Sequence, residues 1–139
     1  MRYLFGLVAP VLGMIFAVGT VVGQSEKKVV DPNWPVPERA AQRKNPLASK
    51  PESADGGRKL FVRMCVSCHG DEFHGQTHDA PDLHTEAVQE ESDGALFWRI
   101  SNGNSRRGMP SFSGLPEGQR WQLVMYIRSL VSGSGILHK

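Results

Sequence analysis

The chain has 139 residues, of which 40% are hydrophobic, and that length supports one modest core rather than two. Its formal net charge is only +2 and it contains no basic run, which argues against binding to nucleic acid. With 15 glycines and 9 prolines, the composition is typical of a small, loop-rich globular domain.

The amino-terminal segment carries no charged residue from position 3 to position 23. Such an apolar stretch is typical of an export signal or of a membrane anchor. Pro10 and Gly13 weaken it as a spanning helix, whereas the small residue Gly23 suits a signal peptidase. We therefore expect residues 1–23 to direct export to the bacterial periplasm, and the pattern leaves open whether they are cleaved or retained.

Residues 24–52 form a charged region with five prolines. Each proline fixes its own φ and biases the preceding residue toward extended conformations. We predict a semi-rigid, extended tether of roughly 3 Å per residue that lets the folded domain sweep away from its attachment point. Trp34 lies in this region, and the sequence leaves open whether it docks on the domain or is exposed in the tether.

Three helical patterns follow, and no strand-like alternation separates them. The first predicts a helix over 53–64, and the second predicts a helix over about 93–102. The third predicts a helix from about 116 to 132 with a periodic apolar face. The sequence therefore indicates an all-α domain over 53–139.

Two long segments, 70–91 and 104–115, separate these helices and are rich in Gly, Pro, Asp and Ser. Loops of that length are hard to accommodate in so small a domain unless something other than the chain fills its centre. A large cofactor would fill that space.

The two cysteines of the chain lie in one heptad, MCVSCHG, at positions 64–70. Cys65, Cys68 and His69 form C-x-x-C-H, the attachment signature for c-type haem. The thiols are spaced to reach the two vinyl groups on one side of the porphyrin, and the imidazole is placed to reach the iron. We predict one covalently attached haem c, with His69 as a ligand of its iron.

Three other interpretations of the heptad are weaker. A zinc site with His74, His78 or His84 would require the adjacent Cys68 and His69 to fit one tetrahedron, and no second C-x-x-C motif follows. A thioredoxin-like dithiol needs a βαβ setting, which the pattern lacks. A disulfide between the two cysteines would constrain almost nothing across so short a loop.

The opposite iron ligand must come from a segment that can approach the ring closely. Met109 lies between Gly108, which removes side-chain bulk, and Pro110, which stiffens the loop. Met64 adjoins the attachment site and Met125 lies inside a predicted helix, so we interpret both as packing residues. We predict Met109 as the sixth ligand; the alternatives are an exposed loop methionine and a histidine ligand from the first long loop.

Over residues 53–132 the chain resembles the class I monohaem cytochromes c. GRKLFVRMCVSCHG is similar to that family's first helix and haem-binding loop, and WQLVMYIRSL resembles the closing helix that crosses it. APDL is similar to the loop whose proline carbonyl, here that of Pro81, accepts a hydrogen bond from the proximal histidine. NGNSRRGMPSF resembles the segment that supplies the sixth ligand, Met109.

The resemblance implies a small cytochrome c fold with three main short helices wrapped around one covalently bound haem. It also implies a one-electron carrier rather than an enzyme, with redox proteins as donor and acceptor. Residues 3–23 lie outside the resemblance, and their apolar pattern alone indicates that they would attach the protein to the membrane if they are retained. The alternatives are a haem enzyme or sensor with an exchangeable sixth ligand, and the electron-entry subunit of a larger dehydrogenase or oxidase. Arg106 and Arg107 flank the ligand loop and could form a docking rim, pair with a haem propionate or simply face water.

Overall fold

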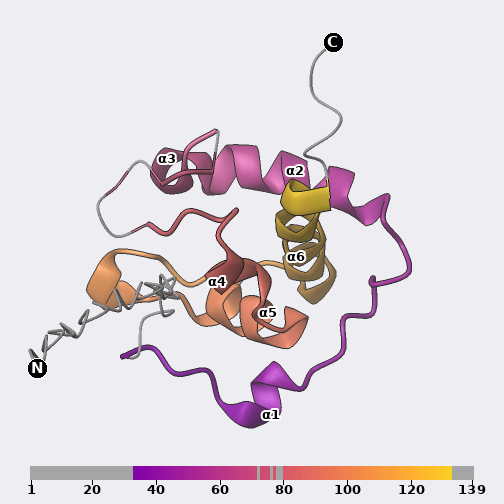
Figure 1. Cartoon of the computed structure of the whole chain (residues 1–139), viewed down its shortest axis with the longest axis horizontal. Coiled ribbons are helices and arrows are strands. Elements are labelled where there is room, and N and C mark those ends of the chain that lie inside the picture. The colour runs from indigo at the N-terminus through magenta and orange to yellow at the C-terminus, as the bar shows by residue number, and fades with distance from the viewer. Residues whose placement is uncertain (1–32, 72, 76, 78–79, 133–139) are drawn as a thin grey trace, which may run out of the picture.

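The computed structural model describes residues 33–71, 73–75, 77 and 80–132 (Figure 1). Within these residues the fold is all-α, as predicted, and contains no strand. The helices are α1 (Glu38–Ala41), α2 (Ser53–Met64), α3 (Val66–His69), α4 (Glu86–Gln89), α5 (Asp93–Asn102), the 3-10 helix η1 (Ser105–Arg107) and α6 (Glu117–Ser132). The predicted export segment lies outside the described residues, and none of the described helices has the length and apolar character needed to cross a membrane.

The three predicted helices are α2, α5 and α6, and local signals set their ends. The Ser92 hydroxyl accepts a hydrogen bond from the Ala95 amide at 3.1 Å and so caps the start of α5. Gly103, with φ of 65°, ends the same helix. The single-turn helices α1, α3 and α4 were not predicted, because four residues carry too little periodicity to detect.

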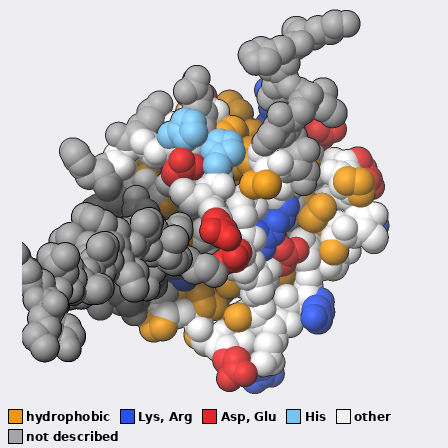
Figure 2. All heavy atoms as spheres, viewed as in Figure 1, with side chains coloured by type: hydrophobic (Ala, Val, Ile, Leu, Met, Phe, Trp, Pro, Cys, Tyr) orange, Lys and Arg blue, Asp and Glu red, His pale blue; other side chains and the backbone are white. Residues whose placement is uncertain are grey.

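The core lies where α2 and α5 meet α6. Trp121 and Val124 of α6 are almost completely buried, and the Phe97 ring of α5 stacks on Trp121 with 4.0 Å between ring centres. Phe61 of α2 is also buried and lies 5.5 Å from the Tyr126 ring. On the face shown in Figure 2, basic and acidic side chains are interspersed, in keeping with the nearly neutral charge.

A glycine allows α2 and α6 to cross in close contact (Figure 1). A Cβ atom built on Gly57 would lie 2.0 Å from the Gln122 carbonyl oxygen and 2.8 Å from Tyr126 Cβ. No side chain fits in that space, so the backbones themselves are in contact at this point. The crossing fixes the direction of α2, whose carboxyl end leads into the C-x-x-C-H heptad.

Residues 33–47, which we call the strap, lie against the domain. The Trp34 carbonyl accepts a hydrogen bond from Arg99 at 3.0 Å, and the Trp34 ring lies 6.2 Å from that of Trp98. Of the two possibilities left open for Trp34, docking on the domain is therefore the one observed. Its partners come from α5, which is distant in the sequence.

The rest of the strap is held in the same way. The Ala41 carbonyl accepts a hydrogen bond from Ser92 Oγ at 2.6 Å, and the side-chain amide of Asn45 donates to the Asp93 carboxylate at 2.8 Å. A Cβ on Gly94 would lie 2.3 Å from the Ala40 carbonyl oxygen, so the backbone of α1 lies directly on α5. The prediction of a free, extended tether is therefore wrong for the strap. Prolines prevent long regular structure, but they leave the backbone carbonyls of the strap able to accept hydrogen bonds from the domain.

Replacement of Gly57 by alanine tests the crossing of α2 and α6. We expect Gly57→Ala to lower the free energy of unfolding by about 1–3 kcal/mol, because the added methyl group forces the two backbones apart. Gly118→Ala is the matched control, since a Cβ there meets nothing within 4 Å. Denaturant unfolding of both variants is the measurement, and equal stabilities would contradict the proposed close contact.

Candidate functional site

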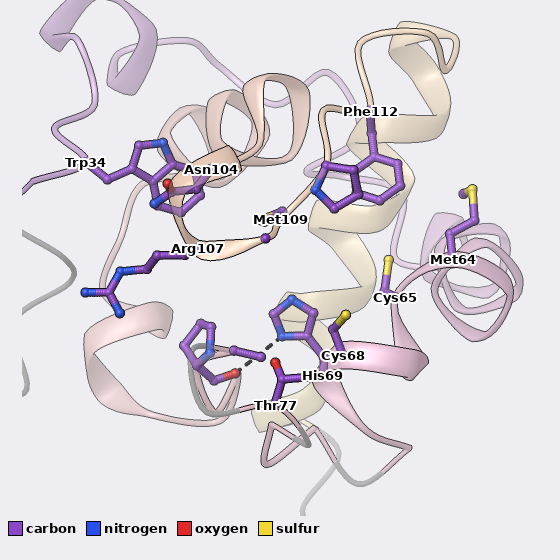
Figure 3. A pocket seen from close by; sticks show the side chains of 14 residues that line it. Trp34, Met64, Cys65, Cys68, His69, Thr77, Asn104, Arg107, Met109 and Phe112 are labelled. Carbon is purple, nitrogen blue, oxygen red and sulfur yellow. Dashed lines mark hydrogen bonds between the residues drawn. The ribbon is translucent and has the colours of Figure 1, made fainter.

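A cavity opens between the end of α2, the turn α3 and the loop that follows α5 (Figure 3). Its empty volume is about 600 Å³, which includes space open to solvent. Its wall includes Cys65, Cys68, His69, Pro81 and Met109. The five residues that we predicted for the site thus line one cavity, although they come from three separate segments.

Helix geometry places the C-x-x-C-H residues on the cavity. The Cys65 amide donates to the Phe61 carbonyl at 2.8 Å and so closes α2. The next turn, α3, begins at once, and the His69 amide donates to the Cys65 carbonyl at 2.9 Å. This change of direction brings both thiols and the imidazole toward the same space (Figure 3).

The chemistry of the cysteines differs from that of a redox dithiol. Both thiols are free and half-buried. Burial, with a smaller contribution from Cys68, raises the pKa of Cys65 to about 11. Reactive dithiols have the opposite property, a lowered pKa that favours the thiolate. The site therefore does not support the thioredoxin-like alternative.

The zinc alternative is not supported either. Among the described residues, the potential metal ligands that come together are His74, Asp82 and His84, and neither cysteine is part of that group. His78, which the zinc alternative also used, lies outside the described residues.

Two opposing effects act on the pKa of His69. Burial lowers its pKa below the usual value, and a hydrogen bond to the backbone carbonyl of Pro81 opposes that shift without reversing it. Nδ1 lies 3.4 Å from the Pro81 oxygen, which can only accept, so Nδ1 carries the proton and Nε2 has a free lone pair. The contact between His69 and Pro81 that the resemblance implied is therefore present, in the tautomer that suits a metal ligand.

The loop after α5 presents Met109 to the cavity. The Asn104 amide donates to the Met109 carbonyl at 2.9 Å and the Met109 amide donates back at 3.0 Å, which closes a tight turn around η1. Gly108 has φ of 78°, a left-handed conformation that favours glycine. A Cβ on Gly103 would lie 2.5 Å from the Pro110 carbonyl, so this glycine lets the two ends of the turn approach each other.

The other methionines and the two arginines considered in the sequence differ in whether they line the cavity. Met125 accepts a hydrogen bond from Asn45 at 3.3 Å and does not line the cavity, consistent with a packing role. Met64 packs against the core and also reaches the cavity wall. Arg107 lines the cavity, whereas Arg106 donates to the Asn33 carbonyl at 2.6 Å.

Sequence reasoning gave no site role to several residues of the cavity wall, among them Trp34, Thr77 and Asn104. Trp34 was noted but was not assigned to the site, because it precedes the first predicted helix by nearly twenty residues. No sequence signal identified Thr77. Asn104 lies in the segment that resembles the one supplying the sixth ligand, but it was given no role of its own.

Residues 52–127 match the protein family described as cytochrome c oxidase, cbb3-type, subunit III. The match covers more than half of the chain. The chain belongs to this family of c-type cytochromes. It is a cytochrome c domain with covalently bound haem c and iron, and it serves in electron transfer. No curated protein sequence matches the chain.

The residues of the cavity fit the haem of a c-type cytochrome. Two thiols at one end could form the thioether bonds, and His69 offers an unprotonated ring nitrogen. Met109 offers a soft thioether from a different segment, and the walls between these groups include Phe112 and Pro110. Two thiols and an imidazole around one pocket suit a covalently attached haem, and the thioether is a possible second axial donor.

Replacement of the cysteines tests their predicted role in haem attachment. We expect Cys65→Ala and Cys68→Ala each to reduce the fraction of haem that stays with the chain after acid denaturation, because each removes one thioether bond. Ser67→Ala is the control, since it changes the exposed residue between them. Haem stain retained on a denaturing gel is the measurement, and undiminished retention in both cysteine variants would contradict the assignment.

Proposed function

We propose that this cytochrome is a one-electron carrier of the bacterial periplasm in which His69 and Met109 are the two axial ligands of the haem iron. The observation that carries the proposal is the cavity to which α3 contributes the imidazole and the loop after α5 contributes the thioether (Figure 3). The bound haem supplies a single-electron redox centre, and the chain supplies its ligands, orientation and shielding.

The surroundings of His69 and Met109 would favour stable binding of both side chains to the iron. The Pro81 carbonyl fixes the His69 ring through Nδ1, which directs Nε2 into the site. The methionine thioether is a soft ligand and favours reduced iron, which raises the reduction potential. Both residues are partly buried, so a ligand from solvent would have to displace a side chain that is already packed.

Arg107 is a candidate partner for the haem propionates. Its side chain lies on the part of the cavity wall away from the two cysteines (Figure 3). Because the thioether bonds fix the vinyl side of the ring at the cysteines, the propionates would lie toward the opposite side, where a guanidinium could pair with them.

A second candidate function is that of an electron-entry subunit in an oxidase complex, and the description of the family favours it. The two candidates share the same redox chemistry and differ in the partner. Donor and acceptor would be redox proteins in either case. Export of the domain is part of both proposals, and residues 3–23 would provide the signal or the anchor.

Substitution of the predicted sixth ligand tests the proposed coordination. We expect Met109→Ala to bind carbon monoxide in the ferrous state and to have a lower reduction potential than the wild type, because loss of the thioether removes the preference for ferrous iron. Visible spectroscopy and a redox titration are the measurements.

Met64→Ala is the matched control, because Met64 also reaches the cavity wall but adjoins the attachment site in sequence. We expect it to keep the wild-type potential and not to bind carbon monoxide. An unchanged potential in Met109→Ala, or a larger change in Met64→Ala, would contradict the assignment. A wild type that binds carbon monoxide readily would favour the enzyme or sensor alternative.

A further inference from the structure

We propose that the strap holds the loop with Met109 closed over the cavity, so that Trp34 is a positioning residue for the sixth ligand. We call residues 104–112 the Met109 loop. This inference rests on the proposed function, because it assumes that Met109 binds the iron. The strap precedes the residues that match the family, 52–127, so the family assignment does not include this contact.

Trp34 is fixed on α5 by a charged network. The Arg99 guanidinium lies 4.4 Å from the centre of the Trp34 ring and donates to the Trp34 carbonyl at 3.0 Å. Arg99 is itself held by a two-pronged contact with Glu91, at 2.7 and 2.8 Å. The two side chains are only 13% and 12% exposed, so water competes weakly for this ion pair. Trp34 thus rests on a preorganised surface.

The strap also contacts the Met109 loop directly. Arg106 of the loop donates to the Asn33 carbonyl at 2.6 Å. Trp34, Asn104 and Met109 all line the cavity (Figure 3). The strap therefore connects α5, which is buried in the core, to the loop that carries the predicted ligand.

The Met109 loop is also attached to α5 near its carboxyl end. Ser111 Oγ donates to the Ser101 carbonyl at 2.6 Å, and the Phe112 amide donates to the Ile100 carbonyl at 3.1 Å. Within the loop, the paired hydrogen bonds between Asn104 and Met109 close the turn. Residues 105–108 between them are exposed. An exposed segment opens at lower free-energy cost than a buried one, so we expect the docking of the strap to contribute to closure of this part of the loop.

The full-length, haem-loaded Trp34→Ala variant tests the inference. Trp34→Ala removes the contacts of the ring with Arg99 and Trp98, so we expect the Met109 loop to open about tenfold more often, which corresponds to about 1.4 kcal/mol. Hydrogen exchange at the amides of Asn104 and Met109 should accelerate by that factor. The rate at which imidazole replaces the sixth ligand in the ferric protein should rise in parallel.

Two variants serve as controls. Trp34→Phe keeps an aromatic ring over Arg99 and should recover most of the wild-type exchange rate. Lys44→Ala changes an exposed residue of the same strap and should have no effect on either rate. Wild-type rates in Trp34→Ala would overturn the strap inference alone if Met109→Ala still opens the iron to carbon monoxide. If Met109→Ala has no effect, the proposed function itself fails.

A different observation supports a second inference. His74, Asp82 and His84 each offer a ligand atom, and these atoms lie within 4.8 Å of one another. Nδ1 of His74 is 2.9 Å from Asp82 Oδ2, and Nδ1 of His84 is 3.3 Å from Oδ1. Ligand atoms of a tetrahedral zinc ion, at about 2.0–2.1 Å from the metal, lie roughly 3.3 Å apart. We infer that this cluster binds a divalent transition-metal cation.

The donor atoms of this cluster select the kind of metal, and its position next to Pro81 would couple that metal to the haem. Two imidazoles and one carboxylate suit zinc, copper or nickel better than magnesium or calcium. Asp82 directly follows Pro81, whose carbonyl orients His69. A bound cation would thus add positive charge and rigidity next to the contact that holds the proximal imidazole, and should raise the reduction potential of the haem.

Equilibrium dialysis of the haem-loaded protein against zinc chloride tests the second inference. We expect one zinc ion per chain, with at least tenfold weaker binding in His74→Ala and in His84→Ala. Glu86→Gln, which removes an exposed carboxylate near the cluster, should bind as the wild type does. A redox titration with and without zinc gives the second readout. Absence of zinc binding, or binding that both histidine variants retain, would overturn the inference.

Discussion

The close crossing of α2 and α6 is the contact on which the other features of the structure depend. It requires a residue without a side chain at Gly57, and Phe61 of α2 and Trp121 of α6 are both buried. Because α2 leads directly into Cys65, the crossing also fixes where both thiols and His69 emerge. The helix that takes part in this crossing therefore leads into the predicted covalent attachment site, while the second predicted ligand comes from a loop.

This arrangement, with the attachment site at the end of a packed helix and the second ligand on a loop, is well suited to an electron carrier. Ligands on a rigid scaffold keep their geometry when the charge of the iron changes, which keeps reorganisation small. The His69 side is fixed by the helices and by the Pro81 carbonyl. The Met109 side depends on a short turn and on contacts from the strap. We therefore expect the strength of the methionine ligation to be adjusted by residues outside the matched region.

Sequence analysis predicted the parts of the molecule with strong local signals. The helices α2, α5 and α6 follow from periodicity and caps, and the C-x-x-C-H spacing identified the cofactor, which the family match confirms. The docking of the strap could not be predicted in the same way. It depends on Arg99, whose charge is satisfied by Glu91 and by the Trp34 carbonyl, and such long-range pairing leaves no trace in a local pattern. For the same reason Trp34 was not assigned to the site.

X-ray absorption at the iron edge of the purified wild-type protein tests the central claim most directly. It reports the atoms bound to iron without any substitution in the chain. Ligation by His69 and Met109 predicts a sulfur neighbour in both the ferric and the ferrous state, on the opposite side from an imidazole nitrogen. Coordination without sulfur, by a second nitrogen or by solvent, would contradict the account.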